Sequence, residues 1–180
     1  MRTRLPTTAA ALALAAGTLT ATGTAQAQAR TVLPEPGPAA ETVADESLRE
    51  RADGIMALTY TEFATTPHVA PFNWTSDGCS VPSAFTPYRK VFRPACDLHD
   101  FGYRNYGGNH ELKLAPTLET KNWIDGRFRE EMVRVCEDTY KTPLRRQSCF
   151  AAAEAYYQAV NKSPQGARAF GLLPSLAPGA

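Results

Sequence analysis

Residues 96–107 read Cys-Asp-Leu-His-Asp-Phe-Gly-Tyr-Arg-Asn-Tyr-Gly, and the interpretation of the whole chain starts from them. Because an α-helix turns by about 100° per residue, four of these side chains fall within one arc of about 100°: Cys96, His99, Asp100 and Tyr103. That arc is the usual width of a core-facing helix surface. His99 and Asp100 lie about 100° apart within it, so the spacing predicts separate roles at neighbouring positions.

A His-Asp dipeptide by itself is most often a surface pair or a hydrogen-bonded pair in a core. Two observations change that interpretation here. The pair follows Cys96 by three residues, and His99 is one of only three histidines, with His68 and His110.

The N-terminus has the pattern of a secretory signal peptide. A basic start precedes a short apolar run over residues 9–16, and small residues then offer cleavage after Ala27 or Ala29. The run is too short to span a membrane, and no later run is apolar enough to do so. We therefore expect residues 1–29 to be removed and the mature protein to be secreted.

The four cysteines are an even number in a small exported domain, where disulfides are the usual outcome. No Cys-x-x-Cys spacing occurs, which argues against a structural zinc site or a redox pair. Three pairings are possible. We expect Cys79–Cys96 and Cys136–Cys149, because each pair joins segments that are close in the sequence.

The charge balance argues against a nucleic-acid partner. Removing Arg2 and Arg4 with the signal segment changes the formal net charge from +1 to about −1, and a near-neutral chain lacks the basic surface that nucleic acids require.

Hydrophobic spacing predicts one all-α, disulfide-stapled domain over residues 41–162. The clearest helix spans 117–140 and keeps Ile124, Phe128 and Met132 on one face. Three other helices are expected over residues 41–63, 94–106 and 145–161. A Pro-rich leader over 30–40 and a flexible tail over 163–180 are expected at the two ends.

Asp125 is an unusual residue, because it lies on the apolar face of the 117–140 helix. A carboxylate there is costly unless it is paired, although an aspartate near a helix start can also be ordinary. His99 is the histidine placed to pair with it, since the 94–106 and 117–140 helices would run antiparallel.

Asp77, Gly78 and Asp100 form a candidate calcium site. A Cys79–Cys96 disulfide would hold the loop at Asp77 and Gly78 against the helix that carries Asp100. Two carboxylates and a main-chain carbonyl are the oxygen ligands that calcium prefers, whereas zinc favours nitrogen and sulfur.

Together these residues favour attack of water on an ester that carries a nearby phosphate. A histidine oriented by a carboxylate can take a proton from water, and calcium can polarise a carbonyl. The chain has no Gly-x-Ser-x-Gly motif and no evident serine or cysteine nucleophile. A zinc hydrolase using His99, His110 and an aspartate is a weaker alternative.

The 96–106 stretch resembles the active-site helix of the secreted phospholipases A2 of prokaryotes and fungi. The similarity extends to residues 74–79 and 124–136 and to the C-terminal residues 149 and 156–160. The sequence departs from the expected pattern at Ala95, where animal enzymes have a second cysteine. It also departs at Gly78, where a larger residue is usual in bacterial members.

The resemblance implies a calcium-dependent phospholipase A2 that releases the sn-2 fatty acid of glycerophospholipids at a membrane or micelle surface. It implies His99 as the general base and Asp125 as its orienting carboxylate. It also implies calcium ligation by Asp77, the Gly78 carbonyl and Asp100. We expect a monomer. The rival hypothesis is a non-catalytic exported lipid- or protein-binding domain on the same scaffold.

Overall fold

The computed structural model describes residues 38–79 and 87–174, with side chains from residue 47 onward. The expected signal peptide and most of the Pro-rich leader lie outside these residues. Within them the chain forms six helices and no strands. They are α1 (Pro38–Met56), α2 (Tyr60–Phe63), α3 (Arg93–Tyr106), α4 (Leu118–Thr139), α5 (Pro143–Asn161) and α6 (Pro164–Ala169). None of these helices is long and apolar enough to cross a membrane.

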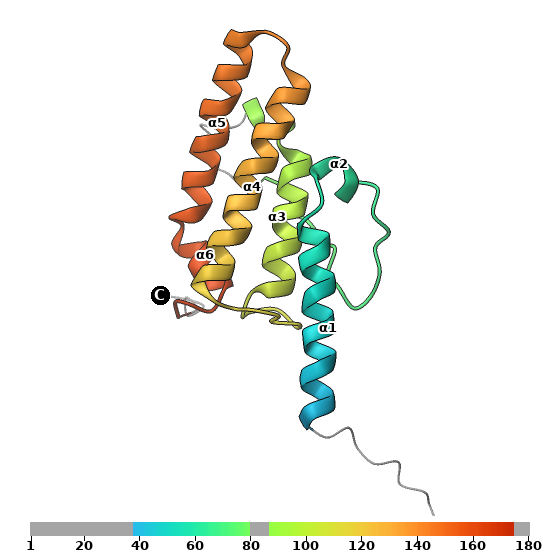
Figure 1. The fold of residues 1–180 in the computed structure, drawn as a ribbon. Helices are drawn as coiled ribbons and strands as arrows, with labels where there is room; N and C mark the ends of the chain where they lie inside the picture. The colour runs from blue at the N-terminus through green and yellow to red at the C-terminus, as the bar shows by residue number, and fades with distance from the viewer. Residues whose placement is uncertain (1–37, 80–86, 175–180) are drawn as a thin grey trace, which may run out of the picture. The chain divides into compact units, whose positions relative to one another are not determined.

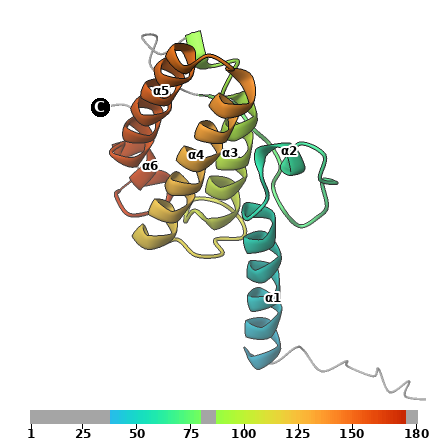
Figure 2. The same ribbon diagram turned by 45° about the horizontal axis from the view of Figure 1, so that its top comes forward.

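Helices α3, α4 and α5 lie side by side and alternate in direction, with α4 in the middle (Figures 1 and 2). The prediction of an all-α domain with two antiparallel central helices is therefore confirmed. Both expected disulfides are present: Cys79–Cys96 ties the loop after α2 to α3, and Cys136–Cys149 ties α4 to α5.

The expected single helix over residues 41–63 is wrong, because the chain breaks between α1 and α2. Thr59 starts α2 with a capping box: its side chain accepts from the Glu62 amide, and the Glu62 carboxylate accepts from the Thr59 amide.

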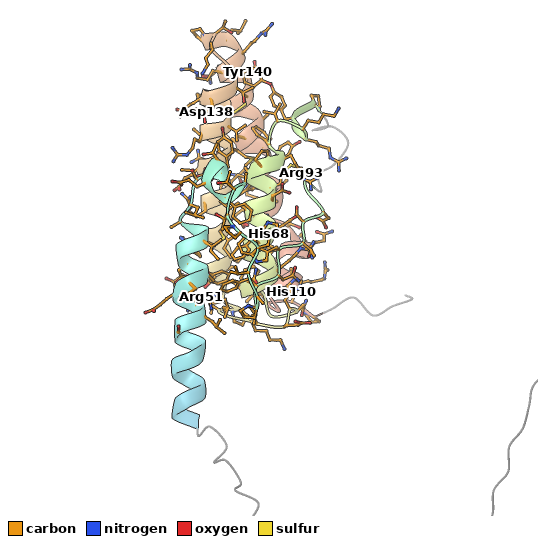
Figure 3. The ribbon with its side chains drawn as sticks, turned by 90° about the vertical axis from the view of Figure 1, so that its right-hand side faces the viewer. Arg51, His68, Arg93, His110, Asp138 and Tyr140 are labelled. Atoms are coloured by element: carbon orange, nitrogen blue, oxygen red, sulfur yellow. A yellow bond between two sulfur atoms is a disulfide. The ribbon has the colours of Figure 1, made fainter. Side chains whose placement is uncertain are left out.

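Helix α2 is tied to the C-terminal end of α4, where the Tyr60 hydroxyl donates to Asp138 at 2.8 Å. Figure 3 shows Asp138 beside Tyr140 at that end, well away from Arg51 of α1.

The expectation of a flexible tail over 163–180 is wrong for residues 163–174. The Ser163 side chain caps α6 by accepting from the amides of Gln165 and Gly166. Phe170 is fully buried, with its ring 5.0 Å from that of Tyr103. Tertiary packing onto α3, which a Pro- and Ala-rich sequence does not reveal, orders this segment.

Helix α3 ends where its chain meets α6. A Cβ on Gly107 would lie 2.6 Å from the Tyr103 carbonyl oxygen and 2.7 Å from that of Ala169. Gly107 has a φ of −70°, so close approach of the backbone, not a left-handed conformation, explains the glycine at this helix stop.

Gly102 of α3 packs closely against Ile124 of α4. A Cβ there would lie 2.7 Å from Cγ2 of Ile124, a distance so short that the Ile124 side chain or the backbone of one helix must shift. We expect Gly102→Ala to lower the free energy of unfolding by about 1–3 kcal/mol, as overpacking usually does. Urea denaturation followed by circular dichroism measures this change.

Gly126 provides the matched control on α4, because no atom lies within 4 Å of the position of its Cβ. Gly126→Ala should raise the free energy of unfolding by up to about 1 kcal/mol through helix propensity alone. Equal stability changes of the same sign in the two variants would contradict the steric explanation for Gly102.

Candidate active site

His99 of α3 and Asp125 of α4 face each other across the helix pair. Nε2 of His99 lies 2.9 Å from Oδ1 of Asp125. His99 is 9% exposed and Asp125 is 0% exposed. The structure thus brings together the two residues that the helical spacing placed on facing surfaces.

Each oxygen of the Asp125 carboxylate has its own pair of partners. Oδ1 is shared by His99 and by the hydroxyl of Tyr103, which donates at 2.8 Å. Oδ2 accepts from Nζ of Lys121 at 2.7 Å and from the Asn161 amide at 3.3 Å. A buried carboxylate is therefore fully satisfied from α3, α4 and the end of α5.

Lys121 and Asn161 were not found by sequence analysis. The i, i+4 spacing of Lys121 and Asp125 is the one available signal, but such pairs are common on exposed helix surfaces.

The charge state of Asp125 follows from these contacts. Burial alone would raise the pKa of its carboxyl, but hydrogen bonds and positive charge from His99 and Lys121 outweigh burial. They hold the pKa below its ordinary value, so Asp125 is ionised at neutral pH.

The His99 ring is enclosed by two aromatic rings. The centroid of Tyr103 lies 4.4 Å away and that of Phe128 lies 4.6 Å away. Burial, followed by the charge and hydrogen bond of Asp125, raises the pKa of Tyr103 far above its ordinary value. Tyr103 is therefore a permanent hydrogen-bond donor to Asp125.

Asp100 faces the loop that precedes the first disulfide. Its Oδ2 accepts from the Ser76 hydroxyl at 2.7 Å and from the amides of Asp77 and Gly78 at 3.0 and 3.2 Å. The loop is held in place because Cys79 is bonded to Cys96, one turn of α3 before Asp100. The three expected metal-site residues therefore lie together, on a different side of α3 from the contact to Asp125.

Negative charge accumulates at this loop. The Ser76 hydroxyl lies 2.5 Å from Oδ1 of Asp97 as well as near Asp100, so two carboxylates share one O–H donor. Burial, with the charge of Asp77, raises the pKa of Asp100 above its ordinary value despite the Ser76 hydrogen bond and nearby cations. Clustered oxygen ligands that include one carboxylate whose ionisation is unfavourable in the protein alone, that of Asp100, fit a hard cation.

Arg104 compensates part of this charge, since its guanidinium lies 3.6 Å from Oδ2 of Asp77. No group of three or more His, Cys, Asp or Glu side chains in residues 47–79 and 87–174 is arranged to hold a metal ion. The same finding leaves the zinc alternative, which requires His99 and His110 in one cluster, without support. A calcium site here would depend on two carboxylates and a main-chain carbonyl.

The structure explains the unexpected glycine at position 78. Gly78 has a φ of +74°, a left-handed conformation, and a Cβ there would lie 2.8 Å from the guanidinium of Arg93. Arg93 is itself fixed by Asp97, with Nε 2.7 Å from Oδ1. A larger residue would be strained by the backbone and would displace Arg93.

Comparison with known sequences shows what the chain is similar to. Residues 55–163, more than half of the chain, match the family described as prokaryotic phospholipase A2. The chain belongs to this family. The match contains His99, Asp125 and all three candidate metal ligands.

A secretory phospholipase A2 of Beauveria bassiana (strain ARSEF 2860) is 35% identical over 102 residues. The aligned part covers 57% of this chain and 49% of that protein. The chain therefore spans about half the length of this curated relative.

Proposed function

We propose that the protein is a secreted, calcium-dependent phospholipase A2 that hydrolyses the sn-2 ester of glycerophospholipids. The observation that carries the proposal is the buried His99–Asp125 contact of 2.9 Å beside the Asp100 loop. A scaffold that only binds lipid or protein needs no ionised aspartate oriented on a histidine.

The chain's own residues supply the proton transfers. Because Nε2 of His99 donates to Asp125, the lone pair of Nδ1 is available to take a proton from a water molecule. The water oxygen forms a bond to the ester carbonyl carbon, and the carbonyl electron pair moves onto its oxygen. When that pair returns, the bond to the sn-2 glycerol oxygen breaks, and His99 gives its proton to this leaving oxygen. The products are a fatty acid and a lysophospholipid.

Asp125 remains a carboxylate throughout and stabilises the protonated ring. Tyr103 donates a hydrogen bond to the same Asp125 oxygen that His99 contacts. Asp77, the Gly78 carbonyl and Asp100 are the residues that would hold calcium. Bound there, calcium would supply positive charge for the ester carbonyl and the lipid phosphate.

The test is product analysis with the secreted chain on vesicles of a phosphatidylcholine that carries different acyl chains at sn-1 and sn-2. We expect release of the sn-2 acid alone with calcium, and no release with a calcium chelator. Zinc should not restore the chelated protein. Lipid binding without hydrolysis would instead favour the non-catalytic binding domain, and release of the sn-1 acid would contradict the regiochemistry.

A further inference from the structure

Lys121 is a buried ammonium that the steps above do not use chemically. It is 1% exposed, and its Nζ lies 2.7 Å from Oδ2 of Asp125 and 3.0 Å from the carbonyl oxygen of Asn161. Burying a charged lysine is costly unless it is paired and hydrogen-bonded. Burial of this positive charge beside Oδ2 of Asp125, the oxygen that His99 does not contact, therefore has a cost in folding free energy.

The two oxygens of Asp125 divide their partners between two sides. Oδ1 faces α3, where His99 and Tyr103 bind it, and Oδ2 faces Lys121 and Asn161. Among these partners Lys121 makes the shortest contact and belongs to the same helix as Asp125. Fixing Oδ2 stops rotation of the carboxylate and reserves Oδ1 for the histidine.

The end of the chain holds Lys121 in place. A Cβ on Gly166 of α6 would lie 3.1 Å from Cε of Lys121 and 3.0 Å from the Tyr103 hydroxyl. The backbone of α6 therefore covers two of the groups that contact Asp125, and Asn161 at the end of α5 contributes both a carbonyl and an amide.

We propose that Lys121 is a positioning residue for the ester hydrolysis proposed above: it fixes the Asp125 carboxylate, held from behind by the α5–α6 junction, so that Oδ1 stays bonded to His99. Without the ammonium, a buried carboxylate keeps only neutral donors and the ring of His99. It then rotates or takes up a proton, and His99 loses the acceptor that orients its ring. Lys121 acts only through Asp125 and does not touch the lipid.

The direct test is Lys121→Met, which keeps the length of the side chain and removes its charge. We expect kcat to fall by about 10- to 100-fold, as for a misplaced catalytic group. KM should change by less than about twofold, and calcium affinity measured by calorimetry should not change. Lys141→Met is the matched control, because Lys141 is an exposed lysine beyond the end of α4, and it should leave kcat unchanged.

Two further variants keep the test decisive if Lys121→Met folds poorly. Asp125→Asn with Lys121→Met removes both charges of the pair together, and its kcat should equal that of Asp125→Asn alone. Gly166→Ala should lower kcat without changing KM, because its new methyl displaces Lys121 and Tyr103. Independent, multiplying effects of Lys121→Met and Asp125→Asn would overturn the proposal, as would a folded Lys121→Met protein with normal kcat.

A second readout does not depend on hydrolysis. The Nε2 proton of His99 should give a downfield proton resonance in NMR spectra, assigned by its absence from His99→Ala. At fixed pH this resonance should broaden or vanish in Lys121→Met but persist in Lys141→Met. An unchanged resonance in Lys121→Met would overturn the positioning role even if the wild-type protein released no fatty acid, an outcome that by itself concerns only the proposed function.

Discussion

Replacing His99 by alanine is expected to lower turnover by about 10²- to 10⁴-fold, the usual contribution of a general base. The two aromatic side chains that pack on the His99 ring, Tyr103 and Phe128, carry no basic group that could replace it. Initial rates of fatty-acid release from calcium-containing vesicles measure the loss.

Calcium affinity should remain unchanged in His99→Ala, because Asp100 faces the Ser76–Gly78 loop and not Asp125. His68→Ala is the control for loss of an imidazole. His68 is exposed and stacks on Trp74 at a centroid distance of 4.6 Å, and it should be dispensable for turnover. More than a tenth of wild-type activity in His99→Ala would contradict the assignment of His99 as the base.

Asp100→Asn is expected to produce the second large effect, a loss of calcium binding together with at least about a 10²-fold loss of turnover. Wild-type calcium affinity should be weak, with a Kd of about 10⁻⁴–10⁻³ M, since two carboxylates and one carbonyl make an open and weakly charged site. Calorimetric titration of the lipid-free proteins measures the calcium affinity of wild type and of Asp100→Asn. Sub-micromolar affinity of the wild type would point to a closed structural ion.

The same substitution should stabilise the calcium-free protein. Burial and the charge of Asp77 raise the pKa of Asp100 in the folded state above its ordinary value of 3.8. At a pH between 3.8 and the raised pKa, the folded protein therefore holds a proton on Asp100 that the unfolded protein has lost. The free energy of unfolding therefore falls as the pH rises from about 4 toward the raised pKa. At neutral pH the ionised carboxylate opposes folding, and the uncharged amide does not.

Melting temperatures at pH 7 in chelator, with and without added calcium, test this consequence. Asp100→Asn should melt above wild type in chelator and should not respond to calcium. Asp138→Asn is the control: it removes a carboxylate at the far end of α4 (Figure 3) and should keep the calcium response. A lower melting temperature for Asp100→Asn in chelator would contradict the sign of the effect.

The main features of the site could be predicted because helical spacing is regular. His99 and Asp125 had to lie on inward surfaces, and a ten-residue connection makes their two helices antiparallel neighbours. The disulfide pairing then placed Asp77 and Gly78 near Asp100, as the structure shows.

The remaining features depend on tertiary contacts. The sequence does not distinguish Lys121 from a solvent-exposed partner of Asp125, because burial by α5 and α6 decides the difference. The order of residues 163–174 comes from Phe170 packing on Tyr103. The constraint at Gly78 comes from Arg93, fifteen positions later in the sequence.

The cover that α6 forms over Lys121 also affects where the folded unit ends. The similarity to the family stops at residue 163, whereas Gly166 and Phe170 are buried against the side chains that surround Asp125. At the other end, the similarity starts at residue 55, yet Asp53 accepts a hydrogen bond from Tyr106. A fragment trimmed to residues 55–163 would keep every candidate catalytic and metal-binding residue but would lack the α6 backbone that covers Lys121. The stretch that matches the family and the folded unit therefore differ at both ends, because residues outside the match pack around Asp125 or bond to Tyr106.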